Sequence, residues 1–200
     1  MTKIKMCGIR RPEDISFVNA VKPEYIGFVF SEASKRYVTP SAAIGLTSIL
    51  DDRIITVGVF VDAPADEVIT LYKSGTICMA QLHGNEDDDY IMKLKNAGVP
   101  NIKAFIISSP EDVERAEKCP ADMILLDSGK GSGKQFDYSL LEDISRPYFL
   151  AGGLTPDNVS DAVARLHPYA VDASSGLESD DFKDFQKMKL FAENVRKCDI

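Results

Sequence analysis

Features typical of several protein classes are absent from the 200-residue sequence. No apolar run approaches the roughly 20 residues that cross a bilayer, and residues 1–8 lack the apolar block of a signal peptide. We therefore expect a cytoplasmic protein with no membrane partner. Basic residues are also scarce, since 23 of them face 31 acidic residues and leave a net charge of −8. This charge excludes counterion release from a phosphate backbone as a general driving force, so nucleic acid is not an expected partner.

Cysteine and histidine are sparse and scattered. The chain has two histidines and four cysteines without a Cys-x-x-Cys pair, and the cysteines are Cys7, Cys78, Cys119 and Cys198. This pattern predicts neither a metal site nor a disulfide framework. We interpret the cysteines, Cys78 above all, as small buried hydrophobes, and Cys7 has a second, chemical interpretation given below. No low-complexity tract or linker interrupts the chain, so we expect one domain over residues 1–200.

Short β-branched runs alternate with longer amphipathic segments, a pattern typical of parallel sheets covered by helices. Eight strand-like segments occupy residues 3–8, 25–30, 54–60, 77–82, 102–107, 123–127, 148–150 and 169–172. Prolines at positions 12, 40, 64, 110 and 156 mark helix starts between them, because a missing N–H costs little there. Eight such units predict a single-domain α/β protein, a (β/α)8 TIM barrel. An open doubly wound sheet is the alternative, but CGIRR at 7–11 is not its G-x-G-x-x-G fingerprint.

The last predicted helix covers residues 182–198. Its apolar residues recur at three- and four-residue steps, at Phe182, Phe185, Met188, Phe191 and Val195. This spacing predicts one apolar stripe packed against the rest of the protein.

Glycine-rich loops follow the last two predicted strands. In a TIM barrel the active site lies at the carboxyl ends of the strands, and these two loops often bind a phosphate through bare backbone N–H groups. The loops read LAGGLTP at 150–156 and SSG at 174–176. Tight turns with positive φ are the alternative explanation, although they account for one glycine pair more readily than for both. A third loop, SGKGSGK at 128–134, lacks Walker A spacing and fits a mobile lid or part of the same anion site.

A thiol and a carboxyl end two of the predicted strands. Side-chain alternation places Lys5 and Cys7 on one face of the first strand, and Leu125 and Asp127 on one face of the sixth. If both faces point into the barrel, Cys7 and Asp127 approach one substrate as a base and an acid, each with a pKa tuned by its surroundings. From spacing alone, a packed cysteine and a capping aspartate explain the two residues at least as well.

A basic pair follows the second predicted strand. Arg36, next to Lys35, has a guanidinium that could bind a carboxylate in bidentate fashion, although a solvated surface pair is the simpler interpretation. We assign no chemical role to His83, interpreted as a hydrogen-bonded structural residue, or to His167, interpreted as a helix-end residue.

The strand ends, taken together, are similar to those of a known family. The shared segments are KMCGI at 5–9, GFVF at 27–30, RYV at 36–38, VGVF at 57–60, QLHG at 81–84, LLDS at 125–128, GSGK at 131–134 with FD at 136–137, LAGGL at 150–154 with NV at 158–159, and VD at 171–172 with SSG at 174–176. In this order and spacing they resemble the phosphoribosylanthranilate isomerases of tryptophan biosynthesis. The resemblance runs from the first strand to the final helix.

The resemblance implies an Amadori rearrangement of a phosphorylated small-molecule substrate without metal or organic cofactor. It implies Asp127 as general acid, Cys7 as general base and Arg36 as the ligand of the anthranilate carboxylate. The implied phosphate ligands are Gly153, Ser174, Ser175 and Gly176. Another sugar-phosphate isomerase or epimerase on the same barrel is one alternative, and a non-catalytic barrel that binds a phosphometabolite is another. Either a monomer or a homodimer is compatible with the sequence.

Three positions depart from the family pattern. Lys35 stands before the arginine where a proline is usual, Lys130 stands where a second glycine is common, and Tyr138 replaces a frequent tryptophan. We expect these departures to change affinity sooner than chemistry.

Overall fold

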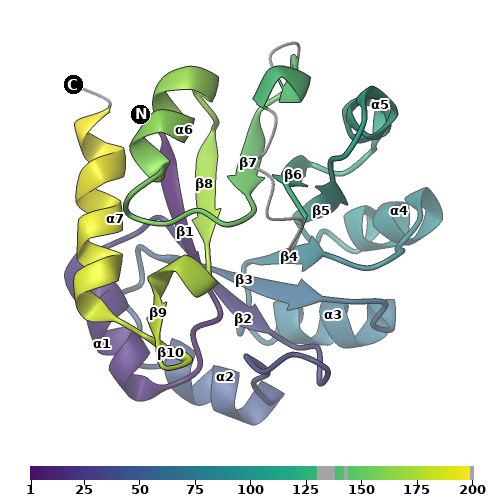
Figure 1. The fold of residues 1–200 in the computed structure, drawn as a ribbon. Helices are drawn as coiled ribbons and strands as arrows, with labels where there is room; N and C mark the ends of the chain where they lie inside the picture. The colour runs from purple at the N-terminus through teal and green to yellow at the C-terminus, as the bar shows by residue number, and fades with distance from the viewer. Residues whose placement is uncertain (130–137, 142–143, 199–200) are drawn as a thin grey trace.

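The computed structural model describes residues 1–129, 138–141 and 144–198. Its eight parallel strands form a closed barrel in chain order, with β8 hydrogen-bonded to β1 (Figure 1). The strands are β1 (Lys3–Cys7), β2 (Tyr25–Val29), β3 (Ile55–Phe60), β4 (Met79–Leu82), β5 (Asn101–Ile106), β6 (Met123–Asp127), β7 (Tyr148–Ala151) and β8 (Ala170–Ala173). The predicted TIM barrel is therefore confirmed, and closure excludes the open sheet.

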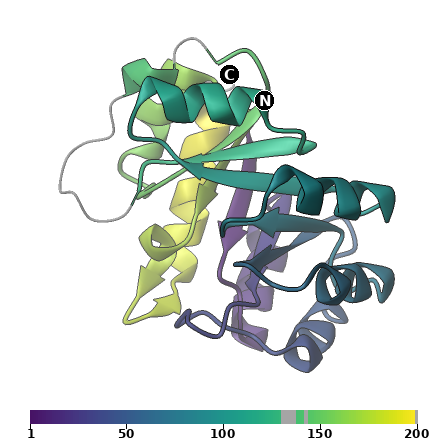
Figure 2. The same cartoon turned by 90° about the vertical axis from the view of Figure 1, so that its right-hand side faces the viewer.

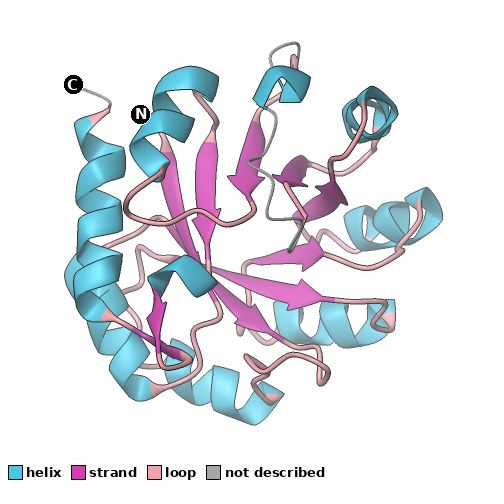
Figure 3. Ribbon diagram, viewed as in Figure 1, coloured by secondary structure: helices cyan, strands magenta, loops and turns pink. Residues whose placement is uncertain are grey.

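Helices surround the barrel on the outside, as Figure 3 shows. They are α1 (Pro12–Val21), α2 (Pro40–Thr47), α3 (Ala65–Lys73), α4 (Asp88–Asn96), α5 (Pro110–Lys118), α6 (Val159–Leu166) and α7 (Phe185–Lys197). Three of the predicted helix-start prolines open α1, α2 and α5, and Pro64 is the N-cap of α3. Pro156 lies in the loop ahead of α6. Between β6 and β7 the described residues form a short 3-10 helix, η1 (Tyr138–Leu141), in place of an α-helix.

None of the helices that the described residues form has the length and apolar character that a membrane span requires.

The chain after β8 differs from the prediction. A 3-10 turn, η2 (Ser175–Leu177), and a hairpin of β9 (Glu178–Ser179) and β10 (Phe182–Lys183) precede the last helix (Figure 2). Asp184 caps α7 by accepting hydrogen bonds from the Gln186 and Lys187 N–H groups. The prediction that Phe182 belongs to the apolar stripe is therefore wrong. Phe182 is 44% exposed, and its ring lies against the guanidinium of Arg11 at 4.3 Å.

Side-chain alternation along the strands produces two apolar layers. The barrel interior holds Tyr25, Val57, Ile102, Ala104, Leu125, Phe149, Ala151 and Ala170. The larger outer layer lies between strands and helices and includes Ile4 and Met6 of β1. Because Ile4 and Met6 face outward, Lys5 and Cys7 face the barrel interior, and Asp127 shares the inward face of β6 with Leu125.

The cysteines divide into two groups. Cys7 and Cys119 are buried, whereas Cys78 and Cys198 are exposed, so the burial predicted for Cys78 and Cys198 is wrong. Cys78 precedes β4, where its backbone N–H donates to the Thr56 carbonyl and its sulfur lies 3.5 Å from Thr56 Oγ1. The apolar run 77–80 therefore lies partly before β4 and partly within it, because the strand begins at Met79.

Candidate active site

Cys7 and Asp127 lie at the same edge of the barrel, because each is the last residue of its strand. Three steps around the closed barrel separate β1 from β6 through β8 and β7, so the two side chains enter the barrel mouth from different sides. Cys7 is 8% exposed. The Asp127 side chain is partly exposed, and its Oδ1 accepts a hydrogen bond of 2.9 Å from the Gly129 N–H. The strand faces of both residues point into the barrel, which was the condition for an acid and a base to approach one substrate.

Gly27 of β2 makes room for the Cys7 sulfur. The two residues are paired in register, and a Cβ atom at position 27 would lie 2.6 Å from Sγ. On its other sides the thiol packs in a small cluster with Val29 and Val59. Burial raises the pKa of the Cys7 thiol, and the nearby Lys5 ammonium opposes that rise. The thiol is thus held in a narrow, largely water-free position.

A buried ion pair lies next to Cys7 inside the barrel. Lys5 is fully buried, and its Nζ lies 2.9 Å from Oδ2 of Asp172 in β8. The β1–β8 register places Lys5 directly opposite Asp172. Alternation had placed Lys5 on the face of Cys7, which was the available signal, but the sequence did not indicate its partner.

His83 lies beside the candidate acid at the end of β4. Its Nε2 is 3.9 Å from Oδ2 of Asp127, and its Nδ1 is 3.1 Å from Nε2 of Gln81. Burial lowers the pKa of His83 and so favours the neutral imidazole, and the Asp127 charge only partly opposes this. The hydrogen-bonded histidine expected from the sequence is thus present, and it lies at the barrel mouth.

Arg36 is paired within the chain. Its Nε and Nη2 donate to the two carboxylate oxygens of Glu178 at 2.7 and 2.6 Å, and its side chain is 13% exposed. A solvated surface pair is therefore the wrong interpretation for Arg36, although it suits the exposed Lys35, which pairs with Asp181. The bidentate bond uses one edge of a guanidinium that carries five N–H donors, so the Nη1 side can still receive a second carboxylate.

Glu178 joins two basic side chains. Besides Arg36 it accepts a hydrogen bond of 2.7 Å from Lys183, whose Nζ also donates to the Ser174 carbonyl at 3.0 Å. Burial alone would raise the pKa of Glu178, but the hydrogen bonds from Arg36 and Lys183 lower it to about 2. Sequence analysis missed Glu178, because nothing local marks a carboxylate 142 positions from its arginine.

The two glycine-rich loops meet. A Cβ atom at Gly176 would lie 2.0 Å from the Leu154 carbonyl oxygen, so only glycine permits this approach. Gly152 and Gly153 instead have positive φ, as the turn interpretation expects, and the space around a Cβ at Gly153 is open. Ser174 Oγ donates to the Cys7 carbonyl at 3.0 Å, which ties the end of β8 to the end of β1.

The candidate lid is only partly described. Lys130 and the loop at 131–133 lie outside the described residues. Tyr138 opens η1, and its ring lies 5.1 Å from the Arg165 guanidinium.

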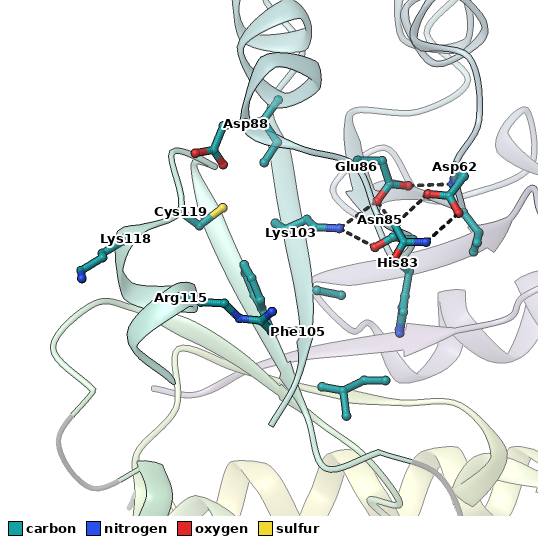
Figure 4. A pocket seen from close by; sticks show the side chains of 15 residues that line it. Asp62, His83, Asn85, Glu86, Asp88, Lys103, Phe105, Arg115, Lys118 and Cys119 are labelled. Atoms are coloured by element: carbon teal, nitrogen blue, oxygen red, sulfur yellow. Dashed lines mark hydrogen bonds and ion pairs between the residues drawn. The ribbon is translucent and has the colours of Figure 1, made fainter. Parts of the chain in front are cut away.

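A cavity of about 760 Å³ adjoins this group of residues at His83 (Figure 4). It extends outward over β5 towards α4 and α5, and its lining includes neither Cys7 nor Asp127. Lys103 reaches into it and donates to the Gly84 carbonyl at 2.7 Å and to Glu86 at 2.8 Å. Among the described residues, no three His, Cys, Asp or Glu side chains come together as metal ligands would.

Comparisons with known proteins identify the family. The family model described as N-(5'phosphoribosyl)anthranilate (PRA) isomerase matches residues 4–194. A protein named N-(5'-phosphoribosyl)anthranilate isomerase from Thermoanaerobacter sp. (strain X514) is 41% identical over 203 residues, covering 98% of each chain. A protein of the same name from Endomicrobium trichonymphae is 44% identical over 194 residues, covering 94% of this chain and 95% of that one.

Solved structures agree with this assignment. The crystal structure of phosphoribosyl anthranilate isomerase from Thermotoga maritima superimposes with a TM-score of 0.91 at 36% identity, covering 98% of this chain and 100% of that chain. A phosphoribosyl anthranilate isomerase in complex with reduced 1-(o-carboxyphenylamino)-1-deoxyribulose 5-phosphate gives 0.89 at 34% identity with the same coverage. The chain therefore belongs to the N-(5'-phosphoribosyl)anthranilate isomerase family.

Proposed function

We propose that this chain catalyses the Amadori rearrangement of N-(5'-phosphoribosyl)anthranilate to 1-(2-carboxyphenylamino)-1-deoxyribulose 5-phosphate, a step of tryptophan biosynthesis. One observation carries the assignment of roles: an inward-facing thiol ends β1, and an inward-facing carboxyl ends β6 at the same edge of the barrel. A reaction that moves one proton off carbon and places another on oxygen needs such a pair.

Asp127 acts as the general acid and Cys7 as the general base. Asp127 donates its proton to the furanose ring oxygen, the C1–O bond breaks, and the nitrogen lone pair forms the C1=N bond of a Schiff base. The Cys7 thiolate then removes the C2 proton, and the electrons of the C–H bond give the enolamine, which tautomerises to the ketose. No proton or electron is left over, because Cys7 returns the removed proton to solvent and Asp127 regains one.

Arg36 and the two loops bind the charged ends of the substrate. Glu178 holds one edge of the Arg36 guanidinium and leaves the other for the anthranilate carboxylate. The phosphate binds at the loops of Gly153, Ser174, Ser175 and Gly176. The contact between Gly176 and Leu154 supports this placement, because it brings the backbones of both loops together at the barrel mouth.

Turnover of variants tests these roles. We expect Cys7→Ala and Asp127→Ala each to lower kcat by about 100-fold or more, the usual effect of removing a proton-transfer group. The loss of anthranilate-type fluorescence from fresh substrate measures it. Cys198→Ala and Asp66→Ala remove an exposed thiol and an exposed carboxylate and serve as controls. Near wild-type turnover in either active-site variant contradicts its role, and substrate that raises Tm without any turnover favours a non-catalytic binding barrel.

Three properties stay predictions: the oligomeric state, the cellular location and the absence of a nucleic-acid partner. A Thermotoga maritima relative is described as dimeric, whereas for this chain both a monomer and a homodimer remain open, which light scattering in solution distinguishes. The cytoplasmic location and the absence of a nucleic-acid partner rest on the sequence alone.

A further inference from the structure

A lysine with no contact to solvent lies directly below the candidate base. Lys5 is fully buried, although its ammonium is strongly hydrated when free. Moving such an ion into a protein interior is costly, and an apolar pair of similar size would often stabilise the barrel as well or better. The position of Lys5 in the barrel interior therefore points to a role beyond stability.

Lys5 and Cys7 share one face of one strand. They are two residues apart in β1, so both side chains point into the barrel, with Lys5 deeper and Cys7 at the mouth. Asp172 holds the ammonium from β8 at 2.9 Å. An ammonium has three N–H donors, and Asp172 receives one of them, which leaves donors for the sulfur above.

Charged groups from four elements face Cys7. Lys5 comes from β1 and Asp172 from β8, while Lys183 comes from β10 and Arg36 from the loop after β2. Arg36 and Lys183 share the single carboxylate of Glu178. These groups comprise three basic side chains and two carboxylates, so a thiolate at Cys7 balances the charge of the set.

Among the three cations, Lys5 has the most freedom to act on the sulfur. The Lys183 ammonium is bonded to Glu178 and to the Ser174 carbonyl, and Arg36 is bonded twice to Glu178. Of the three cations, only the Lys5 ammonium has a single oxygen acceptor in the described part of the chain. One oxygen of that acceptor, Asp172 Oδ1, is buried and has no hydrogen-bond partner among the described residues.

We propose that Lys5 is a positioning residue that stabilises the thiolate of Cys7, with Asp172 holding its ammonium in place. The proton leaves Sγ for solvent, Lys5 stays protonated, and the sulfur is then free to take a proton. Lys5 opposes the rise in the thiol pKa that burial causes, through its charge and through a side-chain hydrogen bond. The consequence for catalysis rests on the proposed function, whereas the effect on the thiol does not.

The pH dependence of thiol alkylation tests the proposal. Iodoacetamide labelling of the full chain is followed at Cys7 by peptide mass spectrometry from about pH 7 to about pH 11.5, because burial already raises the pKa of the thiol. An opposite charge within about 4–6 Å usually lowers the pKa of an acid by about one to three pH units. We therefore expect Lys5→Met to move the labelling midpoint up by at least about one pH unit, which slows labelling at neutral pH about tenfold.

The control and rescue variants are Lys3→Met and Lys5→Arg. Lys3 lies on the same face of β1 at the far end of the barrel, bonded to the Tyr169 hydroxyl, so its removal should leave the midpoint unchanged. Lys5→Arg keeps the positive charge, so its labelling midpoint should stay close to that of the wild type. An unchanged midpoint in Lys5→Met, or an equal shift in Lys3→Met, overturns the proposal.

A double variant covers the case in which Lys5→Met fails to fold. Lys5→Met with Asp172→Asn removes both buried charges and leaves no unpaired carboxylate, and we still expect an upward shift, because Lys5 acts on the thiol more strongly than Asp172. An unchanged or lower midpoint in this variant contradicts the proposal. The proposed function and the proposal for Lys5 can be contradicted separately. Full activity in Cys7→Ala contradicts the role of Cys7 as general base. An unshifted labelling midpoint contradicts only the effect of Lys5 on the thiol.

Discussion

At the scale of single residues, the position of the Cys7 sulfur depends on the absence of a Cβ atom at Gly27. Gly27 leaves the space that a Cβ would fill at 2.6 Å from Sγ, well inside the roughly 3.5–4 Å of a normal contact. Gly27 has no positive φ, so its backbone does not require glycine. The requirement comes from Cys7 across the strand pair, whose sulfur is the nearest atom and whose Cα and Cβ both lie 3.2 Å from the added Cβ.

Gly27→Ala should therefore move the sulfur by about 1 Å or more and lower kcat at least about tenfold, because displacements of that size are costly in proton transfer. Steady-state kinetics measures the loss. Gly45→Ala is the matched control, since a Cβ there meets nothing within 4 Å and alanine is favoured in a helix. A wild-type kcat in Gly27→Ala would show that the sulfur tolerates the shift.

At the scale of elements, α7 covers one side of the barrel. It packs against α1 and α6 and contacts β1, the strand that carries Lys5 and Cys7. Its inward face buries Met188, Phe191 and Val195 completely, whereas Leu190, one step around the helix, is 44% exposed. The helix is therefore held by its apolar stripe.

Phe191→Ala should lower the free energy of unfolding by about 3–5 kcal/mol, the usual cost of truncating a buried aromatic side chain. Leu190→Ala on the next position should cost less than about 1 kcal/mol, because that side chain is partly exposed. Urea unfolding followed by circular dichroism compares the two. Equal losses would mean that α7 does not pack through this stripe.

At the scale of the whole molecule, barrel closure brings distant segments together. The β1–β8 pairing places Lys5 against Asp172, which is 167 positions away. The hairpin after β8 then meets the loop after β2 through the bonds of Glu178 to Arg36. Glu178 thus joins segments from the first and last quarters of the chain.

Glu178→Gln should destabilise the protein in a pH-dependent way. The folded-state pKa of Glu178 is about 2, below its ordinary value of 4.5, so its contribution to stability is fully present above that ordinary value and is lost as the pH falls towards 2. Thermal unfolding between pH 7 and pH 3 should show a Tm gap to wild type that narrows with acid. The comparison variant, Glu193→Gln, removes an exposed helix carboxylate. A gap that stays constant or widens with acid contradicts the predicted linkage.

Local patterns in the sequence were enough to predict the barrel and to show which side chains share a strand face. Alternation along each strand groups the side chains by face, and it correctly grouped Cys7 with Lys5 and Asp127 with Leu125. The preference of proline for the first position of a helix also depends only on local sequence, and Pro12, Pro40 and Pro110 therefore marked helix starts correctly. These features depend on neighbours within a few residues.

Which of these groups meet depends on closure of the barrel. A face does not specify a partner, so the pairing of Lys5 with Asp172 and of Arg36 with Glu178 follows from the register that closure imposes. The prediction for Phe182 was wrong for a similar reason. Its spacing fits the last helix, but Phe182 lies in the hairpin, and the helix begins only after the Asp184 cap. Local periodicity orients side chains, whereas the charges that act on the Cys7 thiol come from four elements that only the closed barrel brings together.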